Sequence, residues 1–279
     1  MRIVIPALAL ALALPLSAHA QTSTQHSLEK LWETDAVLKF PEEVVIEPGG
    51  QFMYVSNTDG APLEKDGRGS IGKIGMDGKV IEVEWVTGLD APKGMRQQGD
   101  LLYLADLAQV VVVDTTKATI VRRIPVPGAT LLHNIVIASD GLLYVSDMFT
   151  GKIHAIRGDQ VSTYVEQLSA PSGLVLSGTD LYVYTGEGLV KIDAQKNRTV
   201  VATGMDRRAN GLQMVDGKEF LATNWGGFVY YISADGSHQV LLDTTADRVP
   251  GGINLYDPKT RTMYMTTDQH NTVVAYRVR

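Results

Sequence analysis

Short apolar runs alternate with turns rich in glycine, proline and aspartate along the chain from about residue 28 onward. Within the runs apolar and polar residues alternate, as in 152–157 and 161–166, and no stretch sustains the period of an amphipathic helix. Turns such as Pro48-Gly49-Gly50 and Ser139-Asp140-Gly141 suit tight hairpins. The pattern predicts an all-β chain.

Six similar phrases, each a turn followed by a short apolar strand, recur along this pattern. The residues at the matching point, here called the ring positions, are Glu42, Lys93, Asn134, Ser172, Asn210 and Gly251. By subtraction they lie 51, 41, 38, 38 and 41 residues apart. A period near 40 residues built from short strands is typical of a β-propeller with one blade per repeat. We therefore predict a six-bladed propeller whose ring positions surround one mouth of a central channel.

The two ends of the chain predict how the ring closes. The last repeat supplies three strands, at about 252–256, 263–267 and 272–278, whereas residues 28–33 read as an outer strand without an inner strand of its own. Pairing this N-terminal strand with the last repeat would complete the sixth blade and remove an exposed sheet edge. No linker or low-complexity run interrupts the chain after residue 28. Residues 21–279 are thus expected to form one domain.

Residues 1–20 have the composition of a signal peptide. Arg2 precedes an apolar stretch, and Ala18-His19-Ala20 forms an A-x-A site for cleavage after Ala20. An uncleaved anchor is disfavoured because the apolar stretch is short and broken by Pro6 and Pro15. A lipoprotein is disfavoured because the chain has no cysteine, which also excludes disulfides. We expect an exported protein, periplasmic or secreted, with no membrane attachment after cleavage.

Charge argues against polyanionic partners. The formal net charge of −6 becomes −7 after removal of residues 1–20, which contain one arginine and no acidic residue. An acidic chain without a basic cluster is a poor candidate for binding nucleic acid or anionic membranes. The expected partner is a small molecule, and the oligomeric state stays open.

The six-repeat layout, Pro41-Glu42, Asn134 and the Asn210-Gly211-Leu212 phrase together resemble the SMP-30/gluconolactonase family of six-bladed propellers, and more distantly the paraoxonases. The resemblance implies a divalent cation, usually calcium, at the channel mouth that assists opening of a lactone. Matched to the family pattern, the metal ligands would be Glu42, Asn134 and Asn210. The chain departs from that pattern in carrying Ser172 and Asn210 where the family has Asn and Asp.

The ring positions also permit a site without a metal. Carboxylate and amide oxygens are the ligands that calcium prefers, but Lys93 follows Glu42 in blade order and could neutralise it as an ion pair. Both interpretations remain open from the sequence. In either case Lys93 and Ser172 are candidate substrate contacts.

Several neighbours of the ring positions are further candidates. His133 adjoins Asn134 and would suit acid–base catalysis, or would simply be a loop histidine bonded to backbone. Met148, Phe149 and Trp225 fall on equivalent loops and are expected to form an apolar rim. Arg207 and Arg208 are expected to meet an anionic group. The other histidines lack zinc-ligand spacing and there is no G-x-S-x-G phrase, so zinc and serine-nucleophile chemistry are not expected.

Two further features of the repeats carry expectations. The excess of the first interval lies in a loop at 58–69, which would border the mouth as a lid or project as a solvated decoration. A short polar residue recurs at the end of the second strand of most repeats, where we expect it to accept backbone hydrogen bonds from the following loop. These residues are Asn57, Asp106, Asp147, Asn224 and Asp268.

The sequence thus predicts metal-assisted hydrolysis of a small lactone or ester at the channel mouth. The alternative is a propeller of the same fold that senses a small molecule or binds a protein without catalysis. The alternative is favoured by the number of carboxylates, because the chain has one fewer at the ring positions than the resemblance implies.

Overall fold

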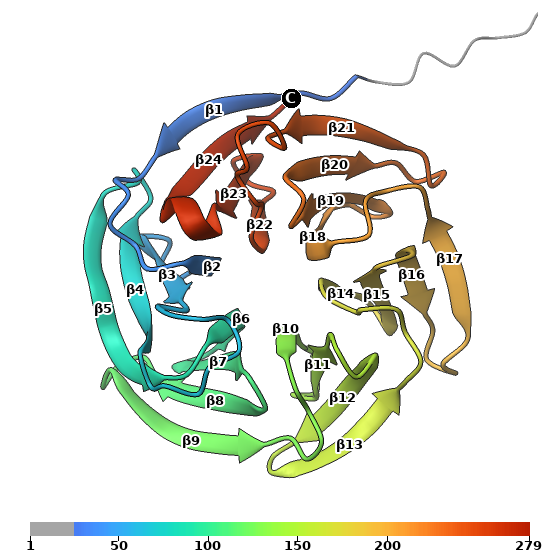
Figure 1. Ribbon diagram of the computed structural model, residues 1–279. Coiled ribbons are helices and arrows are strands. Elements are labelled where there is room, and N and C mark those ends of the chain that lie inside the picture. The colour runs from blue at the N-terminus through green and yellow to red at the C-terminus, as the bar shows by residue number, and fades with distance from the viewer. Residues whose placement is uncertain (1–24) are drawn as a thin grey trace, which may run out of the picture.

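The computed structural model describes residues 25–279 and shows a six-bladed β-propeller (Figure 1). Each blade is a four-stranded antiparallel sheet, and the blades surround a central channel. The single helical element among these residues is the 3₁₀ turn η1 (Asp268–His270). The all-β, six-bladed prediction is confirmed.

The strands follow the chain from the channel outward in each blade. Blades 1 to 3 comprise β2 (Pro41–Ile46), β3 (Phe52–Asn57), β4 (Gly69–Gly75) and β5 (Val80–Leu89); β6 (Pro92–Gln98), β7 (Leu101–Asp106), β8 (Gln109–Asp114) and β9 (Thr119–Pro125); and β10 (Leu132–Ile137), β11 (Leu143–Asp147), β12 (Lys152–Arg157) and β13 (Gln160–Val165). Blades 4 and 5 comprise β14 (Leu174–Ser177), β15 (Asp180–Thr185), β16 (Gly188–Ile192) and β17 (Arg198–Ala202); and β18 (Ala209–Asp216), β19 (Glu219–Asn224), β20 (Phe228–Ile232) and β21 (His238–Asp243).

The sixth blade is built from both ends of the chain, as predicted. It contains β22 (Asn254–Asp257), β23 (Thr262–Thr266), β24 (Val273–Val278) and, as its outer strand, β1 (Leu28–Glu33). The register of β1 on β24 runs from Leu28 opposite Val278 to Glu33 opposite Val274. The N-terminal strand therefore closes the ring, and it covers the edge that β24 would otherwise expose.

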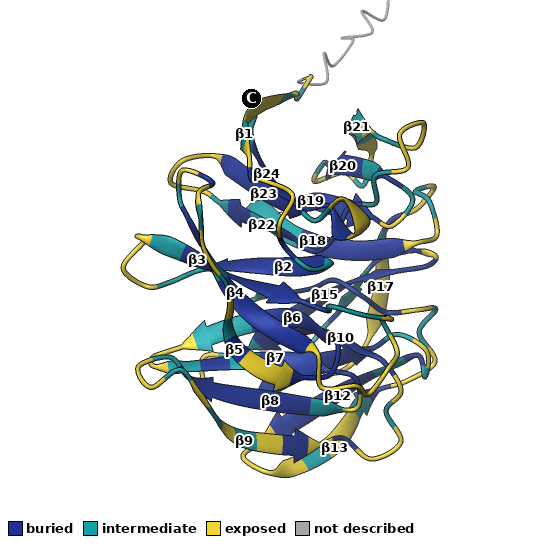
Figure 2. Ribbon diagram, turned by 60° about the vertical axis from the view of Figure 1, so that its left-hand side comes forward, coloured by how far each residue is buried: buried dark blue, intermediate teal, exposed yellow. Residues whose placement is uncertain are grey.

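The hydrophobic core is divided among the junctions between blades. Each of six buried apolar clusters draws its residues from two neighbouring blades, and one of the six joins blade 6 to blade 1. The outer strands are more exposed, as the yellow segments of β9 and β13 show in Figure 2. Because side chains alternate between the two faces of a sheet, each blade packs one face against the preceding blade and the other face against the next.

Hydroxyl groups on the second strands fix the ring positions of the next blade. Four of them donate hydrogen bonds of 2.6–2.8 Å to a main-chain carbonyl at or beside a ring position. The pairs are Ser56 with Lys93, Ser146 with Ser172, Thr223 with Gly252 and Thr266 with Glu42. Buried hydrogen bonds of this kind hold the inner strands at a defined spacing, so the side chains at the mouth start from a rigid frame.

The expected signal peptide, with its cleavage after Ala20, lies outside the described residues. Within residues 25–279, no helix is long and apolar enough to cross a membrane.

Candidate functional site at the channel mouth

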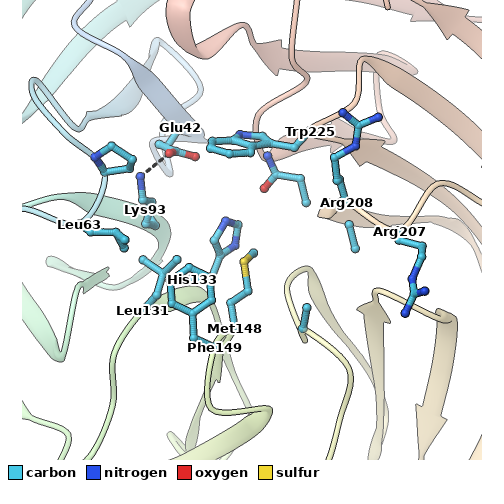
Figure 3. A pocket seen from close by; sticks show the side chains of 14 residues that line it. Glu42, Leu63, Lys93, Leu131, His133, Met148, Phe149, Arg207, Arg208 and Trp225 are labelled. Carbon is cyan, nitrogen blue, oxygen red and sulfur yellow. Dashed lines mark hydrogen bonds and ion pairs between the residues drawn. The ribbon is translucent and has the colours of Figure 1, made fainter.

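A cavity of about 420 Å³ opens at the end of the channel that the ring positions surround; it is here called the mouth cavity (Figure 3). Glu42, Lys93 and Asn210 line it together with His133. Leu63, from the loop at 58–69, lines it as well. The loop therefore borders the mouth, as expected if it acts as a lid.

Lys93 and Glu42 form an ion pair at the floor of the mouth cavity (Figure 3). Both side chains are almost completely buried. The Lys93 ammonium also donates to Thr58 Oγ1 over 3.1 Å. An ammonium has three N–H donors, so these two acceptors leave one donor of Lys93 for a ligand in the cavity.

Three buried side-chain oxygens around this pair have no hydrogen-bond partner: Glu42 Oε2, Asn210 Oδ1 and Asp268 Oδ1. Leaving such atoms unpaired in the interior costs free energy. The Asn210 amide is held from its other side, where Nδ2 donates to the Gly251 carbonyl over 2.8 Å. Its oxygen is therefore not satisfied by the protein and is available to a bound species.

Asp268 is a member of this group that the sequence reasoning missed. It is fully buried, and its Oδ2 accepts a hydrogen bond from the Trp225 indole N–H. A Cβ on Gly252 would lie 2.7 Å from Asp268 Oδ1 and 3.0 Å from the Glu42 carbonyl oxygen, so the glycine allows both residues to approach the same point. Burial, followed by the negative charge of Glu42, holds the pKa of Asp268 well above its ordinary value.

The backbone also sets Asp268 apart from the residues that end second strands, since it begins η1 two residues after β23. Its φ of 42° lies in the left-handed region, which is strained for a non-glycine residue. Asp106 and Asp147 have the structural role that was predicted, but they accept hydrogen bonds from the loop that precedes their blade, through the amides of Ala91 and Leu131. Asp268 has no such backbone donor and instead faces the mouth residues.

Asn134 does not reach the mouth cavity as a free ligand. Its Oδ1 accepts a hydrogen bond of 3.2 Å from the Leu174 amide in the next blade. Of the residues expected to bind a metal, the structure brings Glu42 and Asn210 together at the cavity and engages Asn134 between blades 3 and 4.

His133 lines the mouth cavity but is not the titrating group that its ordinary pKa suggested. Burial, with a smaller effect from the positive charge of Lys93, lowers its pKa to about 3. The imidazole is therefore neutral over the physiological range. The histidine is thus a weaker base than its position in the sequence led us to expect.

Ser172 determines which nitrogen of His133 carries the proton. The Ser172 hydroxyl donates to the Asn210 carbonyl over 2.8 Å, and His133 Nδ1 lies 3.0 Å from the same hydroxyl oxygen. Because a hydroxyl has one hydrogen to donate, Nδ1–H donates to Ser172 and Nε2 keeps its lone pair. Ser172 thus positions His133 and does not itself line the cavity.

The rim is apolar on several sides and carries two arginines, one of which forms an ion pair with an aspartate. Met148, Phe149 and Trp225 line the cavity as predicted (Figure 3). Arg208 also lines it, but its guanidinium is paired with both oxygens of Asp206, at 3.0 and 2.9 Å. Arg207 lies at the same rim and is exposed.

The unpartnered donor atoms at the mouth are of the type that a hard divalent cation prefers, with one change from the expected ligands. Calcium and magnesium take several oxygen ligands, and the unpartnered oxygens of Glu42, Asn210 and Asp268 supply two carboxylates and one amide. No cluster of three or more histidine, aspartate or glutamate side chains able to hold a metal occurs within residues 25–279. The fit therefore depends on the amide of Asn210 and on Asp268 in place of Asn134.

No protein-family model matches the sequence, and a search of curated proteins finds no match. Solved structures share the fold. A catalytically inactive histidine-to-alanine variant of virginiamycin B lyase from Staphylococcus aureus, crystallised with quinupristin, has a TM-score of 0.63 at 14% identity, over 91% of this chain and 99% of that chain. A streptogramin B lyase has a TM-score of 0.67 at 12% identity, over 91% and 98%. At these identities the likeness extends to the propeller fold alone.

Proposed function

We propose that the chain is an enzyme that opens a small lactone or ester by hydrolysis at the mouth cavity. The observation that carries the proposal is the convergence there of a buried ammonium with one N–H to spare and a neutral imidazole with a defined tautomer. Burial strengthens such polar groups, because water does not screen them.

Lys93 is the group suited to the substrate carbonyl. Its remaining N–H would donate to the carbonyl oxygen, and the ammonium charge would stabilise the negative charge that develops there as water attacks. Glu42 and Thr58 hold the ammonium in place before the substrate arrives. Such preorganisation favours the transition state over the ground state.

His133 Nε2 is suited to the attacking water. It would accept the hydrogen bond of that water and its proton as the new C–O bond forms, and the proton would pass to the departing alkoxide as the ester C–O bond breaks. A base with a pKa of about 3 is weak, so His133 orients the water more than it activates it. The same low basicity argues against removal of a carbon-bound proton, which an elimination of the lyase type would need.

Glu42, Asn210 and Asp268 would hold a divalent cation of the calcium type, which supplies Lewis-acid polarisation of a carbonyl oxygen when bound. Lys93 shares Glu42 with this site. Lys93 and a bound cation would therefore compete for the Glu42 carboxylate.

Turnover by matched variants tests the proposal. Wild-type protein should open δ-lactones faster than buffer does, and His133→Asn should lower kcat more than it raises KM, since the histidine acts on water. Because His133 does not titrate near neutrality, kcat/KM should show no His133 step between about pH 5 and 8. If no lactone or ester is turned over while small molecules still raise the melting temperature, the non-catalytic binding propeller replaces the hydrolase.

A further inference from the structure

The buried polar groups of the mouth cavity lie deeper than its exposed apolar side chains. Glu42, Lys93 and His133 are buried at the floor, whereas the two arginines that line the cavity, Arg207 and Arg208, are exposed at the rim. The rim carries Leu63 and Phe149, whose exposed fractions are 53% and 61%. A ligand that reaches the floor must therefore pass and contact apolar side chains.

The exposed apolar side chains at the rim differ from those elsewhere on the molecule. Leu63, Phe149 and Trp225 come from blades 1, 3 and 5 and meet around one cavity. Apart from Val37, which lies in the turn between β1 and β2, the other exposed large apolar residues are single residues on outer strands; they are Leu31, Ile81, Val121, Val200 and Val240. Scattered apolar residues are ordinary on a protein surface, but a group of them around a cavity marks a binding site.

Further side chains in the walls of the cavity continue the apolar surface. They include Leu131 and Met148, together with Ala209 and the exposed Ala170, whose small side chains have no hydrogen-bonding groups. A sugar hydroxyl placed against these walls would lose its water and find no side-chain partner, which costs free energy. An alkyl or aryl group in the same place would gain free energy from removal of its surface from water.

We propose that the mouth cavity selects an ester or lactone that carries a bulky apolar body, in preference to a sugar lactone. This preference rests on the proposed function for the ester group at the floor. The apolar body itself is selected by the walls and rim, so the two parts can be tested separately.

Two series of ligands test the apolar contacts and the ester chemistry separately. 2-Alkyltetrahydropyrans have the ring and tail of a δ-lactone but no carbonyl, so they report the apolar contacts alone. Their Kd for the wild type, measured by calorimetry, should fall about fourfold for each methylene added, as far as the cavity accommodates the tail. Initial rates with δ-decalactone and glucono-δ-lactone, which share the ester ring, should give a higher kcat/KM for the alkyl compound.

Paired serine variants place the effect at the rim. Phe149→Ser should flatten the dependence of Kd on tail length, whereas Val121→Ser, a matched exposed apolar position on the outer strand β9, should leave it unchanged. Kd values independent of tail length, or a higher kcat/KM for the sugar lactone, would overturn the inference and leave the hydrolase proposal intact. A steep dependence on tail length without opening of any lactone would overturn the hydrolase proposal instead, with the apolar preference retained.

Discussion

Replacing Lys93 with methionine is the perturbation that most sharply tests the electrostatics of the mouth. Both partners of the Lys93–Glu42 pair are 2–3% exposed at their side chains. Methionine keeps an unbranched apolar side chain but leaves Glu42 without its counter-charge, beside a second buried carboxyl group, that of Asp268. Breaking a buried pair in this way costs about 3–5 kcal/mol of unfolding free energy.

For a chain of this size such a loss should lower the melting temperature by about 6–20 °C. The measurement is urea and thermal unfolding of the wild type, Lys93→Met and the double variant Glu42→Gln/Lys93→Met. The double variant should recover most of the stability, because no unpaired charge is left at the ring positions. Lys30→Met, which breaks an exposed pair with Glu33, is the control and should change stability little.

Calcium adds a second arm to the same experiment. Without the ammonium, Glu42, Asn210 and Asp268 present two carboxylates and an amide oxygen to a cation. With a Kd in the range of weak extracellular sites, ~10⁻⁴ to 10⁻³ M, about 10 mM calcium should restore roughly 1.4–2.7 kcal/mol to Lys93→Met. A Lys93→Met protein as stable as the wild type would refute the buried-pair reasoning, and a calcium-insensitive one would refute the cation site.

Three further predictions follow from other parts of the structure. Asp268→Asn should abolish the calcium-dependent rise in the melting temperature of Lys93→Met, while Asp66→Asn in the exposed loop should not; an unchanged rise would remove Asp268 from the site. Deletion of residues 25–33 should open the edge of β24 and lower the melting temperature, and an unaltered melting temperature would contradict closure by β1. Below about pH 6.5 His133 is protonated in the unfolded chain, whereas in the folded chain it stays neutral until about pH 3. Between these values the unfolding free energy of the wild type, relative to that of His133→Asn, should fall by about 1.4 kcal/mol for each unit by which the pH is lowered. Parallel pH profiles of the two proteins would show that the histidine is not buried in its neutral form.

The fold followed from the sequence because propeller repeats are local. Each blade closes its own hairpins, so turn residues and strand alternation near Pro48 or Asp140 suffice to define it. Closure by residues 28–33 was also predictable, since a repeat lacking one strand leaves an edge that must be paired. The bridging hydroxyls, such as Thr266, were not predicted, because their acceptors are carbonyls of the next blade and carry no sequence signal.

The site was predictable only in part, for a related reason. Placement of Glu42, Lys93 and Asn210 at one mouth followed from the repeat spacing. The direction of each side chain did not, and so Asn134 was assigned to the cavity although it bonds to the next blade. Asp268 shares a repeat position with structural residues, and its different role depends on Trp225 and Glu42, which are distant in sequence.

The rate of lactone opening by the double variant Glu42→Gln/Lys93→Met tests the central claim most directly. This variant removes the ammonium and its carboxylate together, so it is expected to remain folded while it loses the group proposed to stabilise the oxyanion. In a pH-stat assay with δ-decalactone, the wild type should exceed the buffer rate and the double variant should fall to it, with unfolding curves for both proteins recorded in parallel. A double variant that opens the lactone as fast as the wild type would contradict the account.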